Sequence, residues 1–401
     1  TDDYIMISSK EKAQEIKEIK KLVVWGVVVN IALIHDWLTN MGGAERVVIN
    51  FKQLFPEAPI YTTIYNPDKL DDELKNIDVR TSFLQNKRKA KTNHQKYFPF
   101  MPMAFESFDL NEYDVVLSSS SSCAKGVITN PNTVHICYCH TPMRYGWEFY
   151  YEYLNKEKLS FFKKVFMKYF MNYMRIWDRV SADRVDYFIA NSQNVAKRIW
   201  KHYRRESVVI HPPVRTKLFN VSDMDEEYFL IVSRLVPYKR IDLAVEAFNE
   251  IGLPLVIIGD GSEKQKLQQI AKSNIKFLGR QPDEVIKEYY SKCRAFIFPG
   301  EEDFGITPLE AQASGRPVIA YGKGGALETV VDGETGIFFK EQTVKSLKDA
   351  VINFESYKFD KIKIRKHAEK FDEEIFKKKI QEYVQYCYEE HKNKISSFRV
   401  L

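Results

Sequence analysis

Cysteine is scarce in this chain of 401 residues, which contains only five. The number is odd, and most of the cysteines lie within apolar, strand-like runs, which argues against a disulfide framework. The pattern instead predicts reduced, buried thiols in a cytosolic protein. Cys137 and Cys139 lack both the spacing and the second cysteine pair of a zinc site, so we expect no metal there.

Long apolar runs are also missing, and no secretory signal is visible. The longest run, LVVWGVVVNIALI at 22–34, contains an asparagine and is too short to span ~30 Å of hydrocarbon. Its valine-rich composition predicts a central strand. The charged segment before it predicts an extension outside the fold, residues 1–30. We therefore expect a cytoplasmic protein, at most peripheral on the inner face of the cell membrane.

Acidic residues are absent between Arg80 and Glu106, although the formal net charge of the whole chain is only +6. Basic residues fill this gap, at Arg80, Lys87, Arg88, Lys89, Lys91 and Lys96. A second stretch, 156–177, combines basic and aromatic residues with a single acid. Solvated charge explains the first stretch and a core-packed helix the second, but together they also suit an anionic membrane surface. Nucleic-acid binding is not expected, because no stacking module or helix-turn-helix accompanies the basic run.

Continuous apolar runs dominate what is present, such as those at 229–234, 255–260 and 295–299. Runs without polar alternation belong to parallel strands covered by helices on both faces. We therefore predict an α/β fold with two doubly wound, Rossmann-like domains, whose parallel sheets face each other across a cleft. The domains would cover residues 31–213 and 214–371, and an amphipathic stripe predicts a final helix over 372–392.

Two glutamates flank the point where a predicted strand, 295–298, is followed by a predicted helix, 306–314. The turn at Phe304 and Gly305 would aim backbone N–H groups at a bound anion, with Glu302 and Glu310 beside it to hold sugar hydroxyls. Thr307, Pro308 and Glu310 also fit a capping box. Capping and ligand binding therefore remain equal alternatives for Glu310. Glu302 lies in the loop before the helix, where it has no capping role, so its position favours ligand binding.

Other predicted strand ends carry further candidates, because ligands of open parallel sheets bind beyond the carboxyl ends of the strands. Arg234 and Lys239 follow one strand. The planar guanidinium of the arginine and the flexible ammonium group of the lysine together suit a diphosphate. The glycines of MGGAER would let the backbone approach an anion or a sugar, or would simply form a tight turn. One further loop contains a histidine with basic and aromatic neighbours. The candidate residues of these two loops are Gly42 and Gly43 in the first, and His140, Arg144 and Trp147 in the second.

Two tempting motifs are set aside. The segment IIGDGSEKQKL resembles a dinucleotide-binding loop from Gly259 on, but Lys264 occupies the place of its third glycine. The DxD formed by Asp223 and Asp225 lies in a polar segment away from any predicted strand end, where we expect solvated charge. No metal and no cofactor are therefore expected.

The motifs as a set resemble the retaining glycosyltransferases of family 4, which have the GT-B fold. The resemblance covers about residues 31–392 and is strongest in SRLVPYKRID, GDGSE, FLGR and EEDFGITPLEAQASGRPVIAYGKGGALETV. The segments HDWLTNMGGAE, SSSSCAKGV and CYCHTPMRY resemble bacterial mannosyltransferases that build O-antigen or exopolysaccharide. The resemblance implies an acceptor-side domain followed by a donor-binding domain, with the final helix crossing back to the first.

The resemblance also implies roles for individual residues. Arg234, Lys239 and the backbone of Phe304, Gly305 and Ile306 would hold the donor diphosphate. Glu302 would bind the donor sugar and Glu310 the ribose, while Gly259 would flank the base. His140 would face the reacting sugar, and Gly42 and Gly43 would close over the phosphates and acceptor. Residues assigned to an acceptor or membrane surface are Arg144, Trp147, Lys87, Arg88 and Lys89.

The implied reaction is metal-free transfer of a hexose from a nucleotide sugar, with mannose from GDP-mannose favoured by resemblance alone. The acceptor would be a lipid-diphosphate-linked or polysaccharide glycan. A nucleotide-sugar epimerase of the same architecture and a non-catalytic nucleotide- or polysaccharide-binding scaffold remain alternatives. Product analysis separates the epimerase from the transferase.

Overall fold

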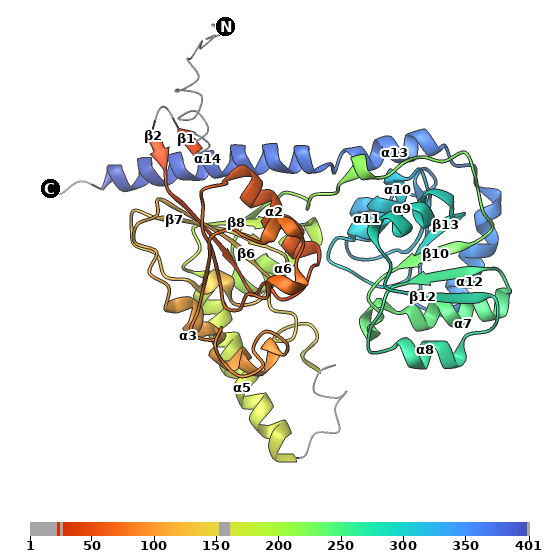
Figure 1. Ribbon diagram of the computed structural model, residues 1–401, viewed down its shortest axis with the longest axis horizontal. Coiled ribbons are helices and arrows are strands. Elements are labelled where there is room, and N and C mark those ends of the chain that lie inside the picture. Colours follow the sequence, from red (N-terminus) through yellow and green to blue (C-terminus); the bar gives the residue numbers. More distant parts are fainter. Residues whose placement is uncertain (1–21, 25–26, 152–160, 399–401) are drawn as a thin grey trace, which may run out of the picture. The chain divides into compact units, whose positions relative to one another are not determined.

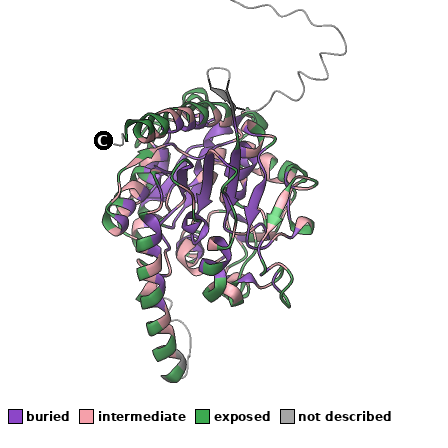
Figure 2. Ribbon diagram, turned by 90° about the vertical axis from the view of Figure 1, so that its left-hand side faces the viewer, coloured by how far each residue is buried: buried purple, intermediate pink, exposed green. Residues whose placement is uncertain are grey.

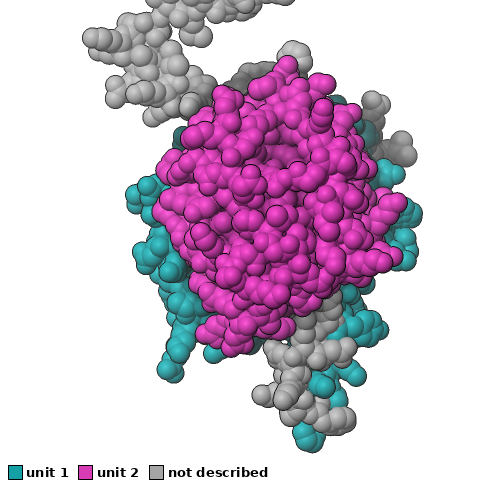
Figure 3. Space-filling view, turned by 90° about the vertical axis from the view of Figure 1, so that its right-hand side faces the viewer, with its two compact units in different colours: residues 1–189, 198–208, 379–401 teal, residues 190–197, 209–378 magenta. Residues whose placement is uncertain are grey.

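The structure is a computed structural model that describes residues 22–24, 27–151 and 161–398. The chain divides into two compact units, which Figure 3 shows in separate colours. Unit 1 comprises residues 1–189, 198–208 and 379–401, and unit 2 comprises 190–197 and 209–378. Most of the expected N-terminal extension and the first residues of the basic, aromatic stretch at 156–177 lie outside the described residues.

Unit 1 is built on a seven-stranded sheet with the order β5-β4-β3-β6-β7-β8-β9, and the pairs from β5 to β7 are parallel (Figure 1). Its strands are β3 (Ile31–His35), β4 (Ile60–Thr62), β5 (Val79–Thr81), β6 (Val115–Ser120), β7 (Val134–Cys139), β8 (Tyr187–Ala190) and β9 (Ser207–Val209). Its helices are α2 (Gly43–Leu54), α3 (Met101–Glu106) and α5 (Phe161–Ala182). Two more helices, α6 (Gln193–Tyr203) and α14 (Glu373–Ser397), begin in unit 2 and end in unit 1. The order places the topological switch of the sheet between β3 and β6.

The prediction of one central strand over the apolar run at 22–34 is wrong in part. Leu22–Val24 (β1) and Val27–Val29 (β2) pair antiparallel in a separate two-stranded sheet, and only Ile31–His35 enters the central sheet. The interruption is at Asn30, where the backbone N–H donates to the Asp114 carboxylate at 2.8 Å instead of continuing a strand. The asparagine therefore ends one element and precedes the next.

Unit 2 is built on a six-stranded parallel sheet with the order β12-β11-β10-β13-β14-β15. Its strands are β10 (Phe229–Val232), β11 (Leu255–Ile258), β12 (Ile275–Gly279), β13 (Ala295–Phe298), β14 (Val318–Tyr321) and β15 (Gly336–Phe339). Its helices are α7 (Ile241–Ile251), α8 (Lys264–Ile270), α9 (Asp283–Lys292), α10 (Ile306–Ala313), α11 (Ala326–Thr329), α12 (Val344–Asn353) and α13 (Lys361–Glu369). This is the strand order of a doubly wound sheet, so the prediction of that fold class is confirmed.

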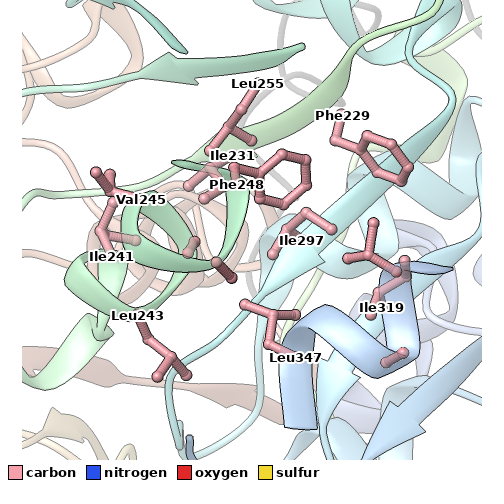
Figure 4. Packing of buried hydrophobic residues seen from close by; sticks show 14 of the residues in the cluster. Phe229, Ile231, Ile241, Leu243, Val245, Phe248, Leu255, Ile297, Ile319 and Leu347 are labelled. Carbon is pink, nitrogen blue, oxygen red and sulfur yellow. The ribbon is translucent and has the colours of Figure 1, made fainter. Parts of the chain in front are cut away.

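The sheet of unit 2 is covered on both faces, which explains its unbroken apolar strands. Phe229 and Ile231 of β10 pack with Phe248 of α7 on one face (Figure 4), whereas Leu230 packs on the other face with Leu309 of α10. Burying such side chains contributes about 1.5–3 kcal/mol each. These two cores fix the carboxyl ends of β10 and β13, from which the candidate site residues extend.

The cysteines are buried thiols, as expected from the sequence. Burial raises the pKa of the Cys137 thiol to about 12, so this group is inert rather than a metal ligand or nucleophile. Among the described residues, no helix is long and apolar enough to cross a membrane.

Candidate functional site

The topological switch of unit 2 brings a lysine and a glutamate together. Lys239 ends the loop after β10, Glu302 lies in the loop after β13, and their side chains form an ion pair. The two side chains are only 16% and 18% exposed. A Cβ added at Gly300 would lie 2.9 Å from the Lys239 carbonyl oxygen, so a glycine here lets the two loops approach. The sequence identified both charged residues but could not show that they contact each other.

Arg234 lies in the same loop as Lys239 and is exposed. Its guanidinium donates a hydrogen bond to the Tyr238 hydroxyl at 2.8 Å. Tyr238 also lies beside Lys239, whose Nζ is 5.5 Å from the centre of the tyrosine ring. One loop therefore presents two cations around a single aromatic side chain, next to the switch where an anion would bind.

The turn between β13 and α10 forms as expected, but the capping-box interpretation is wrong. Helix α10 begins at Ile306, and its N-cap is Gly305 at φ +97°, with no side-chain capping bond. Thr307 therefore already lies inside the helix. The left-handed backbone conformation of Gly305 places the helix start at Ile306, before the start that a cap at Thr307 would set. The Glu310 carboxylate accepts a hydrogen bond from the Tyr290 hydroxyl at 3.0 Å. The first amides of α10 have no acceptor within the helix, as at any helix start.

Close backbone contacts of glycines hold these loops in place. A Cβ at Gly259 would lie 1.9 Å from the Ser233 carbonyl oxygen, which ties the end of β11 to the loop after β10. A Cβ at Gly325 would lie 2.2 Å from the Phe304 Cα, and the Gly325 amide donates to the Glu302 carbonyl at 2.8 Å. The sequence analysis missed Gly325 as a site-forming residue, and the KGG triplet at 323–325 was the signal available.

A histidine missed by the sequence analysis supports the same turn. The His211 ring stacks on Phe304 at 5.1 Å, and its Nε2 lies 3.0 Å from the Glu328 carboxylate. That carboxylate also accepts the backbone N–H groups of Gln193 and Asn194. Burial alone would raise the Glu328 pKa, but the bonds from His211 and the two amides outweigh it and lower the pKa. Phe304 is thus held by packing outside the loop itself.

The switch of unit 1 is organised by Asp36, at the carboxyl end of β3. Its carboxylate is buried and accepts the backbone N–H groups of Ser121, Cys123 and Ala124 at 2.7–2.8 Å. It thereby fixes the serine-rich loop after β6. The sequence analysis quoted this loop only as part of SSSSCAKGV and did not identify Asp36 as its support.

His140 follows β7, and its Nε2 lies 2.8 Å from the Ser119 hydroxyl. The same hydroxyl lies 3.1 Å from Nδ1 of His35, whose Nε2 is 3.7 Å from the Glu45 carboxylate. Burial, and secondarily the charge of His35, lower the pKa of His140 to about 3, which keeps the ring neutral. Gly42, the N-cap of α2, lies against Glu45: a Cβ there would be 3.0 Å from its Oε2.

Trp147 and Arg144 lie among core contacts of unit 1. The Trp147 indole donates to the Asp178 carboxylate at 2.7 Å and stacks on His202 at 4.5 Å. The Arg144 guanidinium lies 5.3 Å from the centre of the Phe149 ring. Trp147 therefore has a structural role that the sequence analysis did not foresee.

The basic run at Lys87, Arg88 and Lys89 is exposed. Helix α5 is exposed along much of its length (Figure 2). Its exposed face carries an apolar stripe, with Phe162 at 83% and Tyr169 at 77% exposure. The remaining exposed side chains of this stripe are Val165, Phe166, Tyr173, Ile176 and Val180. The expectation that this helix is simply core-packed is therefore wrong for one of its faces. The opposite face is buried through Met171 and Met174.

Asp225 lies outside any metal-binding arrangement. Its carboxylate pairs with Lys361 Nζ at 2.7 Å and with the Arg316 guanidinium. Among the described residues, no group of three or more His, Cys, Asp or Glu side chains could hold a metal ion.

Comparison with protein-family models gives two matches that together extend over most of the chain. Residues 41–218 match Glycosyltransferase Family 4, and residues 214–377 match Glycosyl transferases group 1.

Individual proteins are similar at low identity. The α-1,3/1,6-mannosyltransferase ALG2 of Dictyostelium discoideum is 24% identical over 386 residues, covering 80% of this chain and 88% of that protein. The O-antigen chain mannosyltransferase RfbU of Salmonella typhimurium is 27% identical over 218 residues, covering 49% of this chain and 60% of that protein. Across the curated relatives compared, the match covers between 26% and 88% of the relative's own length. For an uncharacterised glycosyltransferase of Methanocaldococcus jannaschii it covers about half, 52%.

A solved structure shares the fold. Anabaena HepE in complex with UDP has a TM-score of 0.65 and 17% identity, and the match covers 89% of this chain and 100% of that chain.

Proposed function

Because the chain belongs to glycosyltransferase family 4 and has the GT-B fold, we propose that it transfers mannose from GDP-mannose with retained configuration. The mannosyltransferases among its relatives, ALG2 and RfbU, support the choice of sugar. The observation that carries the proposal is the Lys239–Glu302 pair at the switch of the unit 2 sheet, beside the start of α10.

In the proposed reaction, the bond between the anomeric carbon and the diphosphate breaks while an acceptor oxygen bonds to the same face. The acceptor proton passes to the departing phosphate oxygen, so no protein nucleophile and no metal are required. Arg234, Lys239 and the first amides of α10 stabilise the charge that grows on the diphosphate. Lys239 exchanges its carboxylate partner for phosphate, which leaves Glu302 to accept hydrogen bonds from the sugar.

A thermal-shift panel of GDP, UDP, ADP and their hexose conjugates, with EDTA throughout, tests the donor and the metal independence. A ligand at 100 times its Kd stabilises the folded state by ~2.7 kcal/mol, which shifts the melting temperature visibly. We expect GDP and GDP-mannose to stand out and to lose their effect in Arg234→Ala. A preference for UDP, the ligand in the HepE structure, would overturn the donor assignment.

Product analysis with GDP-mannose and a lipid-diphosphate-linked glycan then tests the reaction. We expect a new glycosidic bond with retained configuration. Conversion of the donor without any acceptor would indicate an epimerase, and binding without turnover a scaffold.

We infer that an anionic membrane lies against helix α5, where such an acceptor would be presented. The exposed apolar stripe recurs every three or four residues over Phe162–Val180, as on a helix lying in a membrane interface. Basic side chains flank the stripe at Lys164, Lys168, Arg175 and Arg179, and the single acid of α5, Asp178, is fully buried.

A neighbouring segment extends this basic surface. The Phe98 ring contacts the Phe170 ring of α5, with 5.8 Å between centroids. Phe98 thereby places the 87–96 segment beside the helix, with exposed cations at Lys87, Arg88, Lys89, Lys91 and Lys96. A second protein copy would need acidic partners for these cations, whereas anionic lipid headgroups supply them directly.

Sedimentation with liposomes tests this surface. We expect the protein to bind vesicles that contain anionic lipid, to be released by salt, and not to bind neutral vesicles. Replacing Phe162, Phe166 and Tyr169 by serine should abolish binding, whereas replacing Ile352 and Ile362, which are also exposed, at 54% each, should not. Equal binding by both variants, or no binding by the native protein, would remove the membrane from the proposal.

A further inference from the structure

Hydrogen bonds join a line of three polar side chains in unit 1, namely His35, Ser119 and His140. Glu45 of α2 lies 3.7 Å from Nε2 of His35, at the end of β3. Nδ1 of His35 lies 3.1 Å from the hydroxyl of Ser119 on β6, and that hydroxyl is 2.8 Å from Nε2 of His140. His35 is 3% exposed and Ser119 is fully buried, so water does not compete for these bonds.

The backbone determines where the protons lie. Nδ1 of His35 is also 3.2 Å from the Ser119 carbonyl oxygen, which can only accept, so Nδ1 must donate. Because the Ser119 hydroxyl then faces a donor at His35, its own proton is directed to Nε2 of His140. A neutral His140 with an accepting Nε2 carries its proton on Nδ1.

We propose that His35 and Ser119 are positioning residues that hold His140 in the Nδ1–H tautomer and in one ring orientation. The Nδ1 position of the histidine then carries a hydrogen-bond donor rather than a lone pair. This inference rests on the proposed function for the contact of His140 with the transferred sugar, but the tautomer itself does not.

The neighbouring residue provides a matched control. Ser118 donates to or accepts from Nε2 of His135 at 2.8 Å, and both residues are fully buried. Ser118 precedes Ser119 on β6, and successive side chains of a strand point to opposite faces of the sheet, so this equivalent bond lies on the face opposite Ser119. Ser118→Ala therefore removes an equivalent bond without affecting the proposed arrangement.

NMR of ¹⁵N-labelled imidazoles, with the His140 signals assigned from His140→Gln, tests the tautomer. We expect Nδ1–H in the native protein, a mixture of tautomers in Ser119→Ala, and no change at His140 in Ser118→Ala. If Ser119→Ala fails to fold, His35→Gln is the second variant. It removes the ring donor that faces the Ser119 hydroxyl, so we expect the preference at His140 to loosen. An Nε2–H tautomer in the native protein, or an unaltered tautomer in both variants of the arrangement, would overturn the inference.

Kinetics provide the second readout. We expect Ser119→Ala to lower kcat at least tenfold with the donor KM within twofold, because the ring still fills its place but samples wrong orientations. Ser118→Ala should leave both constants within twofold. Equal loss in the two variants would mean a structural role only. If no donor is turned over at all, the proposed function fails, while the NMR result still decides the tautomer.

Discussion

The Lys239–Glu302 pair leads to a prediction in which two substitutions act in opposite directions on nucleotide binding. Each side chain is more than four-fifths buried, so each charge depends on the other for compensation. Breaking a fully buried pair costs about 3–5 kcal/mol, whereas an exposed pair contributes about 0–1 kcal/mol. For this intermediate burial we expect Lys239→Met and Glu302→Gln each to lower the free energy of unfolding by about 1.5 kcal/mol. The double variant should lose less than the sum, with a coupling of about 1 kcal/mol.

Binding of GDP separates the two roles. Lys239→Met removes a charge-assisted bond of about 1.5–3 kcal/mol, so the Kd should rise by roughly 10–150-fold. Glu302→Gln removes the carboxylate that competes with phosphate for Lys239, so GDP should bind as tightly as before or up to about tenfold more tightly. GDP is the right probe because it has no sugar for Glu302 to contact.

Calorimetric titration of GDP into the native protein and the three variants, beside urea unfolding, measures both effects. Turnover of GDP-mannose should fall in Glu302→Gln although GDP binds well, because the lost contact is with the sugar. If Glu302→Gln weakens GDP as much as Lys239→Met does, Lys239 does not exchange partners. Additive unfolding energies would mean that the pair contributes nothing in solution.

Three further predictions concern stability and the site. Burial lowers the pKa of His135 to about 3, so the unfolded chain binds a proton first and stability falls as the pH drops below ~6.5. At pH 5.5 this one histidine should cost ~1.4 kcal/mol, seen as a smaller acid shift of the urea midpoint in His135→Gln. Gly325→Ala should destabilise by about 1–3 kcal/mol and weaken nucleotide binding, because its Cβ would overlap the turn before α10. Gly322→Ala, with its nearest neighbour at 3.5 Å, is the control. Lys125→Met should cost about 3–5 kcal/mol in thermal unfolding, because it leaves the fully buried Asp178 without its cation.

Sequence patterns predicted the elements of unit 2 well. The predicted strand at 295–298 is β13, and the predicted helix at 306–314 is α10, shorter by one residue. Apolar runs and the glycine turn are local signals, so they report on local structure. The predicted cap at Thr307 was wrong because backbone conformation at Gly305, rather than side-chain chemistry, begins the helix.

The composition of α5 did not predict which of its side chains are exposed. The sequence contains aromatic and basic residues in this helix, and a core-packed helix explained the aromatics equally well. Only the packing shows that Met174 is buried while Phe162 and Tyr169 remain exposed. A helical period specifies which residues share a face, but not which face meets the core.

The sequence by itself determined the fold class, the strands and the charged residues at their ends, because periodicity and turn chemistry act over a few residues. The tertiary structure alone decided which of those residues meet. Lys239 reaches Glu302 because β10 lies beside β13, and Ser119 reaches His35 because β6 lies beside β3. Strand order is set by the burial of whole layers rather than by any one segment, so contacts between distant loops follow only from the assembled sheet.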